Sequence, residues 1–326
     1  RYSDDIEIEM LVARKYTNDN NVHVIPSTLK SDLLNFTSVA WRNLLFRMFK
    51  TDNSAQHSTA SFPILSHSFV NNYPCDVVSL HWIGDAMLSI EGISKIRKPI
   101  VWKLADQWAY CGAEHYTHIP GGFSESETDT RYAYGYNYKP FFEKGLDINR
   151  RTWRRKINSW PDNMKIVATS SWMAECARKS ILLNNCQIYT IPNPIDPEEW
   201  KLHDKGHCKK QLKLPDNSII LTFGSIGGLK DSRKGGDLLL KSLTILYSDS
   251  CIKAIRDRII VCIFGSNDDG SMKDSPFLSF FLGPIYNQSK LNQIYCASDI
   301  FLCPSRLEAF GQTAAEAQIC GVPVVA

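Results

Sequence analysis

Short apolar runs alternate with longer amphipathic segments along this chain of 326 residues. Repeated strand–helix units imply parallel sheets that are covered by helices on both faces. The sequence therefore predicts an α/β protein in which ligands bind at the carboxyl ends of the strands. The predicted strands are 8–12, 22–25, 76–81, 99–104, 165–169, 187–191, 219–223, 259–264, 277–281 and 300–302, and the predicted helices are 37–50, 141–160, 171–183, 235–247 and 289–297. A helical pattern also follows the strand at 76–81 as far as Lys95, and an irregular loop is expected at 107–137.

Prolines at 192, 194 and 197 mark a domain boundary, because they favour an extended segment that cannot continue a helix. We expect an N-terminal domain at 1–195 and a C-terminal domain at 196–326. The first residue stands in mid-pattern and the last inside an apolar strand, so we expect a chain cut at both ends.

Composition narrows the class of protein. A hydrophobic content of 44% with 22% charged residues is typical of a globular protein, and a net charge of +3 is too small to indicate nucleic-acid binding. No apolar run is long enough to span a bilayer. The ten cysteines are scattered without a C-x-x-C pair, which predicts a reducing, cytoplasmic location.

A strand–loop–helix corner at 303–325 carries the first candidate site. Glu308 precedes a turn at Phe310-Gly311, and a helix is expected to begin near Thr313, with Glu316 in it. The backbone N–H groups and the positive end of the helix dipole would suit a phosphate. Alternatively, Thr313-x-x-Glu316 is a capping box, in which Glu316 satisfies only its own helix end.

A glycine-rich loop at 224–236 carries the second candidate site. Arg233 and Lys234 stand just before a predicted helix, where they could neutralise a phosphate. The alternative is a solvated basic turn. Taken together, cations for phosphates and carboxylates for hydroxyls favour a nucleotide diphosphate-sugar as the ligand.

Several motifs resemble those of the retaining glycosyltransferases of family 4. They are EAFGQTAAE with its E-x7-E spacing, GVPVV, RKG, LGPIYNQSKLNQIYCASDIFLCPS and the IPNPID segment. The first half is similar to a bacterial polysaccharide-biosynthesis subgroup through LHWIGDAMLSIEGISKIRKPIVWKLADQWAYCGAEHY. The resemblance implies a GT-B fold, that is, two facing Rossmann-like domains with parallel sheets.

The resemblance also implies residue roles. Glu308 would hold the donor sugar, Phe310 and Gly311 would present backbone amides, and Glu316 would bind the ribose. Arg233 and Lys234 would neutralise the diphosphate. Gln312 and Thr313 would begin the helix beneath the phosphates, and Gly265 and Ile285 would lie near the nucleobase.

The sequence departs from the family pattern at two positions. Ser225 stands where many members have arginine, so Arg233 is expected to compensate. Ala105 replaces a histidine in front of Asp106, which puts any histidine-assisted step there in doubt. The glycine-rich loop after the first strand and the C-terminal segment that crosses back are not found in the sequence.

Three residues of the first half are acceptor-side candidates: His81, Asp106 and His115. Asp106 could orient an acceptor hydroxyl, or it could simply cap the following turn. His81 could equally be a structural imidazole. Cys111, His115 and His118 lack a fourth ligand and a common zinc spacing, so no metal site is expected.

We therefore expect a hexosyltransferase that moves a sugar with retention from a nucleotide-sugar to a glycan or lipid-linked glycan. The catalytic candidates are Glu308, Asp106 and Lys234. No DxD motif occurs in a matching context, so neither metal nor cofactor is expected beyond the nucleotide-sugar co-substrate. Basic stretches at 41–50 and 150–156 could rest on the inner face of a membrane, or form ordinary surface helices. A nucleotide-sugar epimerase and a non-catalytic binding fragment are the alternatives.

Overall fold

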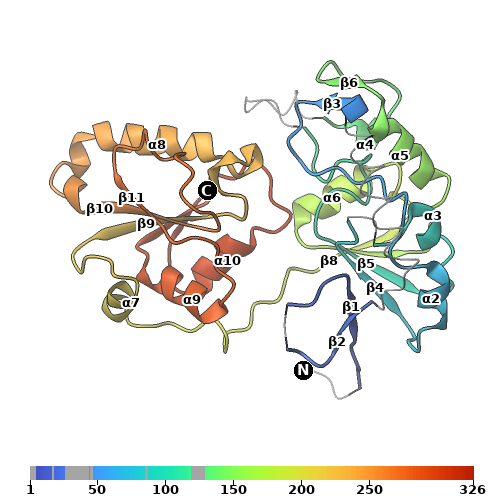
Figure 1. Ribbon diagram of the computed structural model, residues 1–326, viewed down its shortest axis with the longest axis horizontal. Helices are drawn as coiled ribbons and strands as arrows, with labels where there is room; N and C mark the ends of the chain where they lie inside the picture. Colours follow the sequence, from blue (N-terminus) through green and yellow to red (C-terminus); the bar gives the residue numbers. More distant parts are fainter. Residues whose placement is uncertain (1–4, 17, 26–43, 45–46, 85–86, 119–128) are drawn as a thin grey trace. The chain divides into compact units, whose positions relative to one another are not determined.

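The computed structural model describes residues 5–16, 18–25, 44, 47–84, 87–118 and 129–326. The chain divides into two compact units, Arg1–Ile191 and Pro192–Ala326. Each unit contains a sheet in which all strands run parallel, so the predicted α/β class is confirmed (Figure 1).

The main sheet of the N-terminal unit has four strands in the order β4-β5-β7-β8. Along β5, Trp102 and Leu104 are buried whereas Lys103 between them is half-buried, so the two faces of the strand differ. Because all four strands are parallel, their carboxyl ends lie along one edge. The strands are β4 (Val78–His81), β5 (Ile100–Leu104), β7 (Lys165–Ala168) and β8 (Gln187–Thr190).

Among the described residues of this unit, five helices and two small sheets accompany the main sheet. Ser170 caps α6 by accepting a hydrogen bond from the Met173 N–H. The helices are α2 (His67–Asn72), α3 (Ile90–Ile93), α4 (Arg131–Tyr134), α5 (Ile148–Ile157) and α6 (Ser171–Lys179). The small sheets pair β1 (Met10–Val12) with β2 (Val22–Val24), and β3 (Phe49–Thr51) with β6 (Glu143–Gly145).

The C-terminal unit is built on a five-stranded parallel sheet in the order β11-β10-β9-β12-β13. Every residue of β10 is buried, as expected for a strand covered on both faces. The strands are β9 (Ile219–Gly224), β10 (Ile259–Phe264), β11 (Leu278–Phe281), β12 (Ile300–Leu302) and β13 (Val324–Val325).

Helices cover both faces of this sheet (Figure 1). On one face, Ile260 and Phe264 pack in a cluster with residues of α7, α9 and α10, whereas Val261 and Ile263 pack with residues of α8 on the other. The helices are α7 (Lys205–Gln211), α8 (Gly236–Ser248), α9 (Gln288–Ala297) and α10 (Gln312–Ile319), and the short 3-10 turns are η2 (Gly228–Lys230), η3 (Ser232–Lys234), η4 (Ser250–Ile252) and η5 (Arg256–Arg258).

Three sequence predictions are wrong in part. The basic helix predicted at 141–160 begins only at Ile148, because Gly145 is left-handed (φ 78°) and Asp147 caps the helix. The helical pattern before Lys95 gives only α3. Of the helix predicted at 37–50, residues 37–43 and 45–46 lie outside the described residues, and Phe49 and Lys50 belong to β3.

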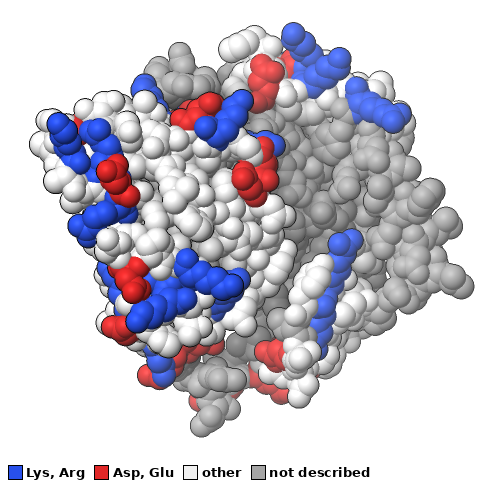
Figure 2. Space-filling view, turned by 60° about the vertical axis from the view of Figure 1, so that its left-hand side comes forward, with Lys and Arg blue, Asp and Glu red and all other residues white. Residues whose placement is uncertain are grey.

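Charged residues of both signs share the described surface that one view shows. Figure 2 shows Lys and Arg interspersed with Asp and Glu on the described surface in view. Within α5, Lys156 is buried and Arg155 is half-buried, so the basic stretch 150–156 is in part a buried element. None of the helices in the described ranges has the length and apolarity that crossing a membrane requires.

A buried lysine holds the segment after β5. The Lys156 side chain is fully buried, and its Nζ donates to the carbonyl oxygens of Trp108, Cys111 (3.0 Å) and Gly112 (2.6 Å). The ammonium also lies 3.9 Å from the Trp108 ring centroid and 5.2 Å from that of Trp160. Burial lowers the pKa of Lys156, while three carbonyl acceptors favour its charged form. The segment 107–115 is therefore packed and ordered by this amine.

We predict that Lys156→Met destabilises the protein by roughly 2–4 kcal/mol, because it leaves three buried carbonyls without a donor. The exposed Arg154→Met on the same helix is the matched control and should change stability by less than about 0.5 kcal/mol. Chemical unfolding followed by tryptophan fluorescence measures both. Equal stability of the two variants would show that Lys156 does not hold the segment.

Candidate functional site

Four loops of the C-terminal unit leave its sheet at the same edge. They follow the carboxyl ends of β9, β10, β11 and β12. The predicted residues Arg233, Lys234, Gly265, Ile285 and Glu308 all stand in these loops, at the edge where parallel sheets bind ligands. The parallel order of the sheet therefore gathers residues that are far apart in the sequence.

The loops after β9 and β12 are packed directly against one another. Gly235 is left-handed (φ 70°), and a Cβ there would lie 1.9 Å from the carbonyl oxygen of Pro304. The Arg306 backbone N–H donates to the Arg233 carbonyl (2.8 Å). The Arg306 guanidinium donates to the Ser232 carbonyl (2.7 Å) and to the Asp237 carboxylate (2.6 Å). Arg306 thus fastens the two loops, a role for which the sequence contains no signal.

This packing brings the predicted cations to the predicted carboxylate. The Lys234 ammonium donates to Glu308 Oε1, and Arg233 Nη1 lies 3.8 Å from Glu308 Oε2. Arg233 is also paired with Asp231 at 2.9 Å. The three side chains of the central group are 17–24% exposed, so their charges are partly desolvated. Charges of both signs are therefore poised at one point of the edge.

Glu316 does not form the capping box that the sequence allowed. The N-cap of α10 is Gly311 (φ 83°), and no side chain caps this helix end. Instead, Glu316 accepts hydrogen bonds from Gln312 Nε2 (2.9 Å) and from the Tyr295 hydroxyl (3.0 Å). Burial raises the pKa of Glu316. Its carboxylate is thus held beneath the first turn of α10, which also contains Thr313 and follows Phe310.

The remaining donor-side candidates lie around the ends of β9, β10 and β11. Gly265 is left-handed (φ 95°), and its N–H donates to the Gly283 carbonyl (2.9 Å). A Cβ on Gly265 would lie 2.3 Å from the carbonyl oxygen of Ser225, so the chains approach closely here. Ser225 itself is buried, and Ile285 packs partly buried against the core cluster.

We predict that Gly235→Ala disrupts this corner much more than Gly227→Ala. Both glycines are left-handed, so alanine strains each backbone by about 1–2 kcal/mol. At Gly227 a Cβ would meet nothing within 4 Å, whereas at Gly235 it would meet the Pro304 carbonyl. Melting temperatures of the two variants compare the effects. Equal losses would mean that the loops are not in contact.

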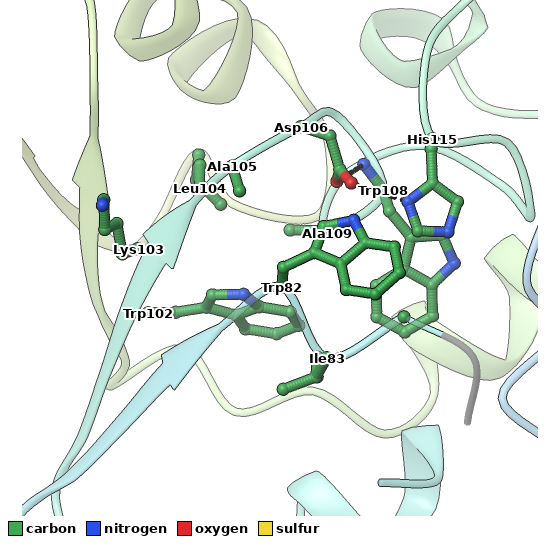
Figure 3. Close-up of a pocket in the computed structure, with 11 residues that line it drawn as sticks. Trp82, Ile83, Trp102, Lys103, Leu104, Ala105, Asp106, Trp108, Ala109 and His115 are labelled. Atoms are coloured by element: carbon green, nitrogen blue, oxygen red, sulfur yellow. Dashed lines mark hydrogen bonds and ion pairs between the residues drawn. The ribbon is translucent and has the colours of Figure 1, made fainter. Parts of the chain in front are cut away.

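In the N-terminal unit, Asp106 and His115 are brought together with a residue that sequence reasoning missed. The His115 Nδ1–H donates to Asp106 Oδ2 at 2.6 Å, and Nε2 is 2.8 Å from the Ser58 hydroxyl oxygen (Figure 3). All three residues are buried. Asp106 Oδ1 also accepts from the Trp108 N–H (2.9 Å), so it orders the turn as well. Nothing in the sequence links Ser58 to a histidine 57 positions away.

His81 does not join this group. Its Nε2 lies 3.0 Å from the Ser79 hydroxyl, and it is not among the residues that line the pocket of Figure 3. Cys111 is buried, and the His118 ring packs on Phe142 with centroids 4.1 Å apart. Within the described ranges, His, Cys, Asp and Glu side chains form no group of three or more that could hold a metal.

Backbone strain is concentrated beside the same group. Three non-glycine residues of the described ranges have positive φ, and two of them are Ala60 (φ 45°) and Trp82 (φ 35°). Such conformations cost on the order of 1–3 kcal/mol each and cluster at functional sites. The Ala60 carbonyl accepts from Arg155 (3.2 Å), which Glu91 holds through two further bonds. Trp82 follows β4 and is 47% exposed beside the pocket.

Comparison with known families gives a match for most of the C-terminal unit. Residues 220–326 match the family model described as "Glycosyl transferases group 1". The matched range contains every donor-side candidate, from Arg233 to Glu316.

Two curated relatives extend this match. The D-inositol 3-phosphate glycosyltransferase of Actinosynnema mirum is 27% identical over 173 residues, which cover 50% of this chain and 40% of the relative. That of Geodermatophilus obscurus is 31% identical over 150 residues, which cover 42% and 32%. The aligned stretches thus span less than half the length of these relatives.

Solved structures match the fold over most of the chain. The Anabaena protein HepE in complex with UDP and glucose has a TM-score of 0.51 at 15% identity, covering 94% of this chain and 66% of that one. Sucrose-phosphate synthase from Thermosynechococcus elongatus has a TM-score of 0.52 at 15% identity, covering 94% and 63%. The expected GT-B type of fold, built from two Rossmann-like units, is therefore confirmed.

Proposed function

We propose that the protein is a retaining glycosyltransferase that moves a sugar from a nucleotide diphosphate donor to a hydroxyl of a glycan, without a metal ion. The observation that carries this proposal is the meeting of Lys234, Arg233 and Glu308 beside the amino end of α10. This meeting lies within the segment that matches the glycosyl transferases group 1. The bound UDP and glucose of HepE, which has the same fold, support a nucleotide-sugar donor.

Each donor-side group has a role in this proposal. Lys234 and Arg233 neutralise the diphosphate together with the backbone N–H groups of Gly311, Gln312 and Thr313. Glu308 and the Phe310 backbone hold the sugar. The buried Glu316 accepts hydrogen bonds from the ribose hydroxyls, and the turns at Gly265 and Ile285 border the base. No resident cofactor is required.

The transfer step in this proposal is the one that the resemblance to family 4 implies. The bond between the anomeric carbon and the diphosphate oxygen breaks, and its electron pair leaves with the diphosphate. The acceptor oxygen attacks from the same face and forms the new glycosidic bond, while its proton passes to the departing phosphate. Negative charge grows on the diphosphate during this step, and the two cations and the helix end stabilise it.

The N-terminal unit supplies the acceptor side in this proposal. Asp106, oriented by His115 and by the Trp108 N–H, accepts a hydrogen bond from the acceptor hydroxyl. His81 remains an acceptor-side candidate outside this group. The acceptor in this proposal is a free or lipid-linked glycan. The proposed location is reducing and cytoplasmic, and the ten unpaired cysteines support that location. Contact with the inner face of the membrane stays a prediction.

We predict that Glu308→Gln and Lys234→Met each reduce transfer by about 100-fold or more, because each removes charge that acts on the donor. Lys241→Met, an exposed lysine on α8, is the matched control and should retain full activity. The assay follows release of the nucleoside diphosphate from UDP-, GDP-, ADP- and dTDP-sugars, with and without glycan acceptors. Calorimetry with each nucleoside diphosphate measures donor binding separately.

Two outcomes would contradict this proposal. Full activity in either site variant would remove the assigned roles of Glu308 and Lys234. Conversion of the donor in the absence of any acceptor, without release of the diphosphate, would instead identify a nucleotide-sugar epimerase.

A further inference from the structure

We propose that Trp82 is the stacking platform for a pyranose ring of the acceptor, and that Asp106 binds the hydroxyls of the same ring. The inference rests on the proposed function only in calling this sugar the acceptor. It deepens that function, because it assigns a pyranose ring of the acceptor glycan to a named side chain of the N-terminal unit.

Trp82 lies at the edge of the sheet where parallel sheets bind ligands. It follows His81, the last residue of β4, at the carboxyl edge of the sheet. Its ring centroid lies 5.8 Å from that of His115, and Figure 3 shows it beside Asp106 and His115. A Cβ on Gly84 would lie 2.9 Å from His115 Cε1 and 3.0 Å from Trp82 Cζ2. The glycine therefore lets the two rings lie together.

The other tryptophans near this pocket belong to the buried core. Trp102, Trp108 and Trp160 pack on one another with centroids 5.0–6.2 Å apart, and each is at most 9% exposed. Trp82 is 47% exposed, so burial does not account for its strained backbone. A strained backbone beneath a side chain that is only partly packed is a feature found at ligand-binding sites. A ligand that covers its indole face explains both features.

The chemistry around Trp82 suits a sugar. One face of a pyranose ring presents C–H groups that an indole can cover, and its rim presents hydroxyls that must find hydrogen-bond partners. The Asp106 carboxylate is 11% exposed and borders the same pocket, where its oxygens can accept further hydrogen bonds. Ala105, the residue before it, is exposed and has a small side chain. An apolar platform next to an oriented acceptor group is what a pyranoside requires.

The test follows Trp82 directly in the full chain labelled with 5-fluorotryptophan. The chain has eight tryptophans, and the fluorine resonance missing in Trp82→Phe identifies residue 82. The probes are the methyl α-pyranosides of glucose, galactose and mannose, each raised to roughly 50 mM, where a millimolar site is saturated. We expect at least one pyranoside to shift the Trp82 resonance. We also expect Asp106→Asn to weaken that binding by about tenfold.

Saturation-transfer NMR with the same pyranosides compares Trp82→Ala with Phe141→Ala. Phe141 is an exposed aromatic of the same unit outside the pocket lining, so its variant is the matched control. We expect Trp82→Ala to abolish the signal, Trp82→Phe to retain part of it, and Phe141→Ala to leave it intact.

Three results would overturn the inference. The first is an unchanged Trp82 resonance with all three pyranosides, and the second is an equal loss of the saturation-transfer signal in Phe141→Ala. The third is a shift of the Trp82 resonance by UDP alone, which would identify a residue that stacks on the base. These readouts need no turnover. Pyranoside binding at Trp82 in a protein that binds no nucleotide would contradict the proposed function and leave this site standing.

Discussion

The buried ammonium of Lys156 is the interaction on which the N-terminal site depends. It donates to three carbonyls of the segment between Asp106 and His115, so a stretch that reads as an irregular loop is held rigidly. The Gln107 N–H donates to the His115 carbonyl (2.9 Å) and closes the segment. The hydrogen bond between Asp106 and His115 is then a consequence of the fold, since the backbone contacts fix both ends of the segment.

The C-terminal site uses charge in a different way. Lys234 and Glu308 come from loops after different strands and bind each other at a partly exposed edge. Under the proposed function, a donor with a negative diphosphate and a hydroxyl-bearing sugar would offer each of them a new partner. If Lys234 and Glu308 exchange each other for groups of the donor, each keeps an opposite charge or a hydrogen bond. This exchange costs less free energy than leaving a buried charge unpaired. The pair therefore holds the two loops together at this edge, and under the proposed function a bound donor would exchange partners with it.

The sequence predicted most of the strands, because their apolar runs are bounded by turns and prolines. The contact of Lys234 with Glu308 could also be predicted, since loops at the carboxyl ends of parallel strands lie along one edge of the sheet. The contacts of Ser58 and Arg306 could not be predicted, because no motif or periodicity marks these two residues. The helix predicted at 141–160 shows a further limit. Gly145 and Asp147 delay its start to Ile148, and composition alone does not reveal this start.

Strain and exposure distinguish the two candidate sites further. The glycines at 235, 265 and 311 take left-handed conformations in the C-terminal unit at little cost, so its loops approach closely without strain. In the N-terminal unit the same region of φ is occupied by Ala60 and Trp82, whose side chains make it unfavourable. Arg155 bonded to the Ala60 carbonyl stabilises one of them, whereas Trp82 is 47% exposed and its ring packs on that of His115 with centroids 5.8 Å apart. A side chain held at such a cost is most simply explained by what it binds.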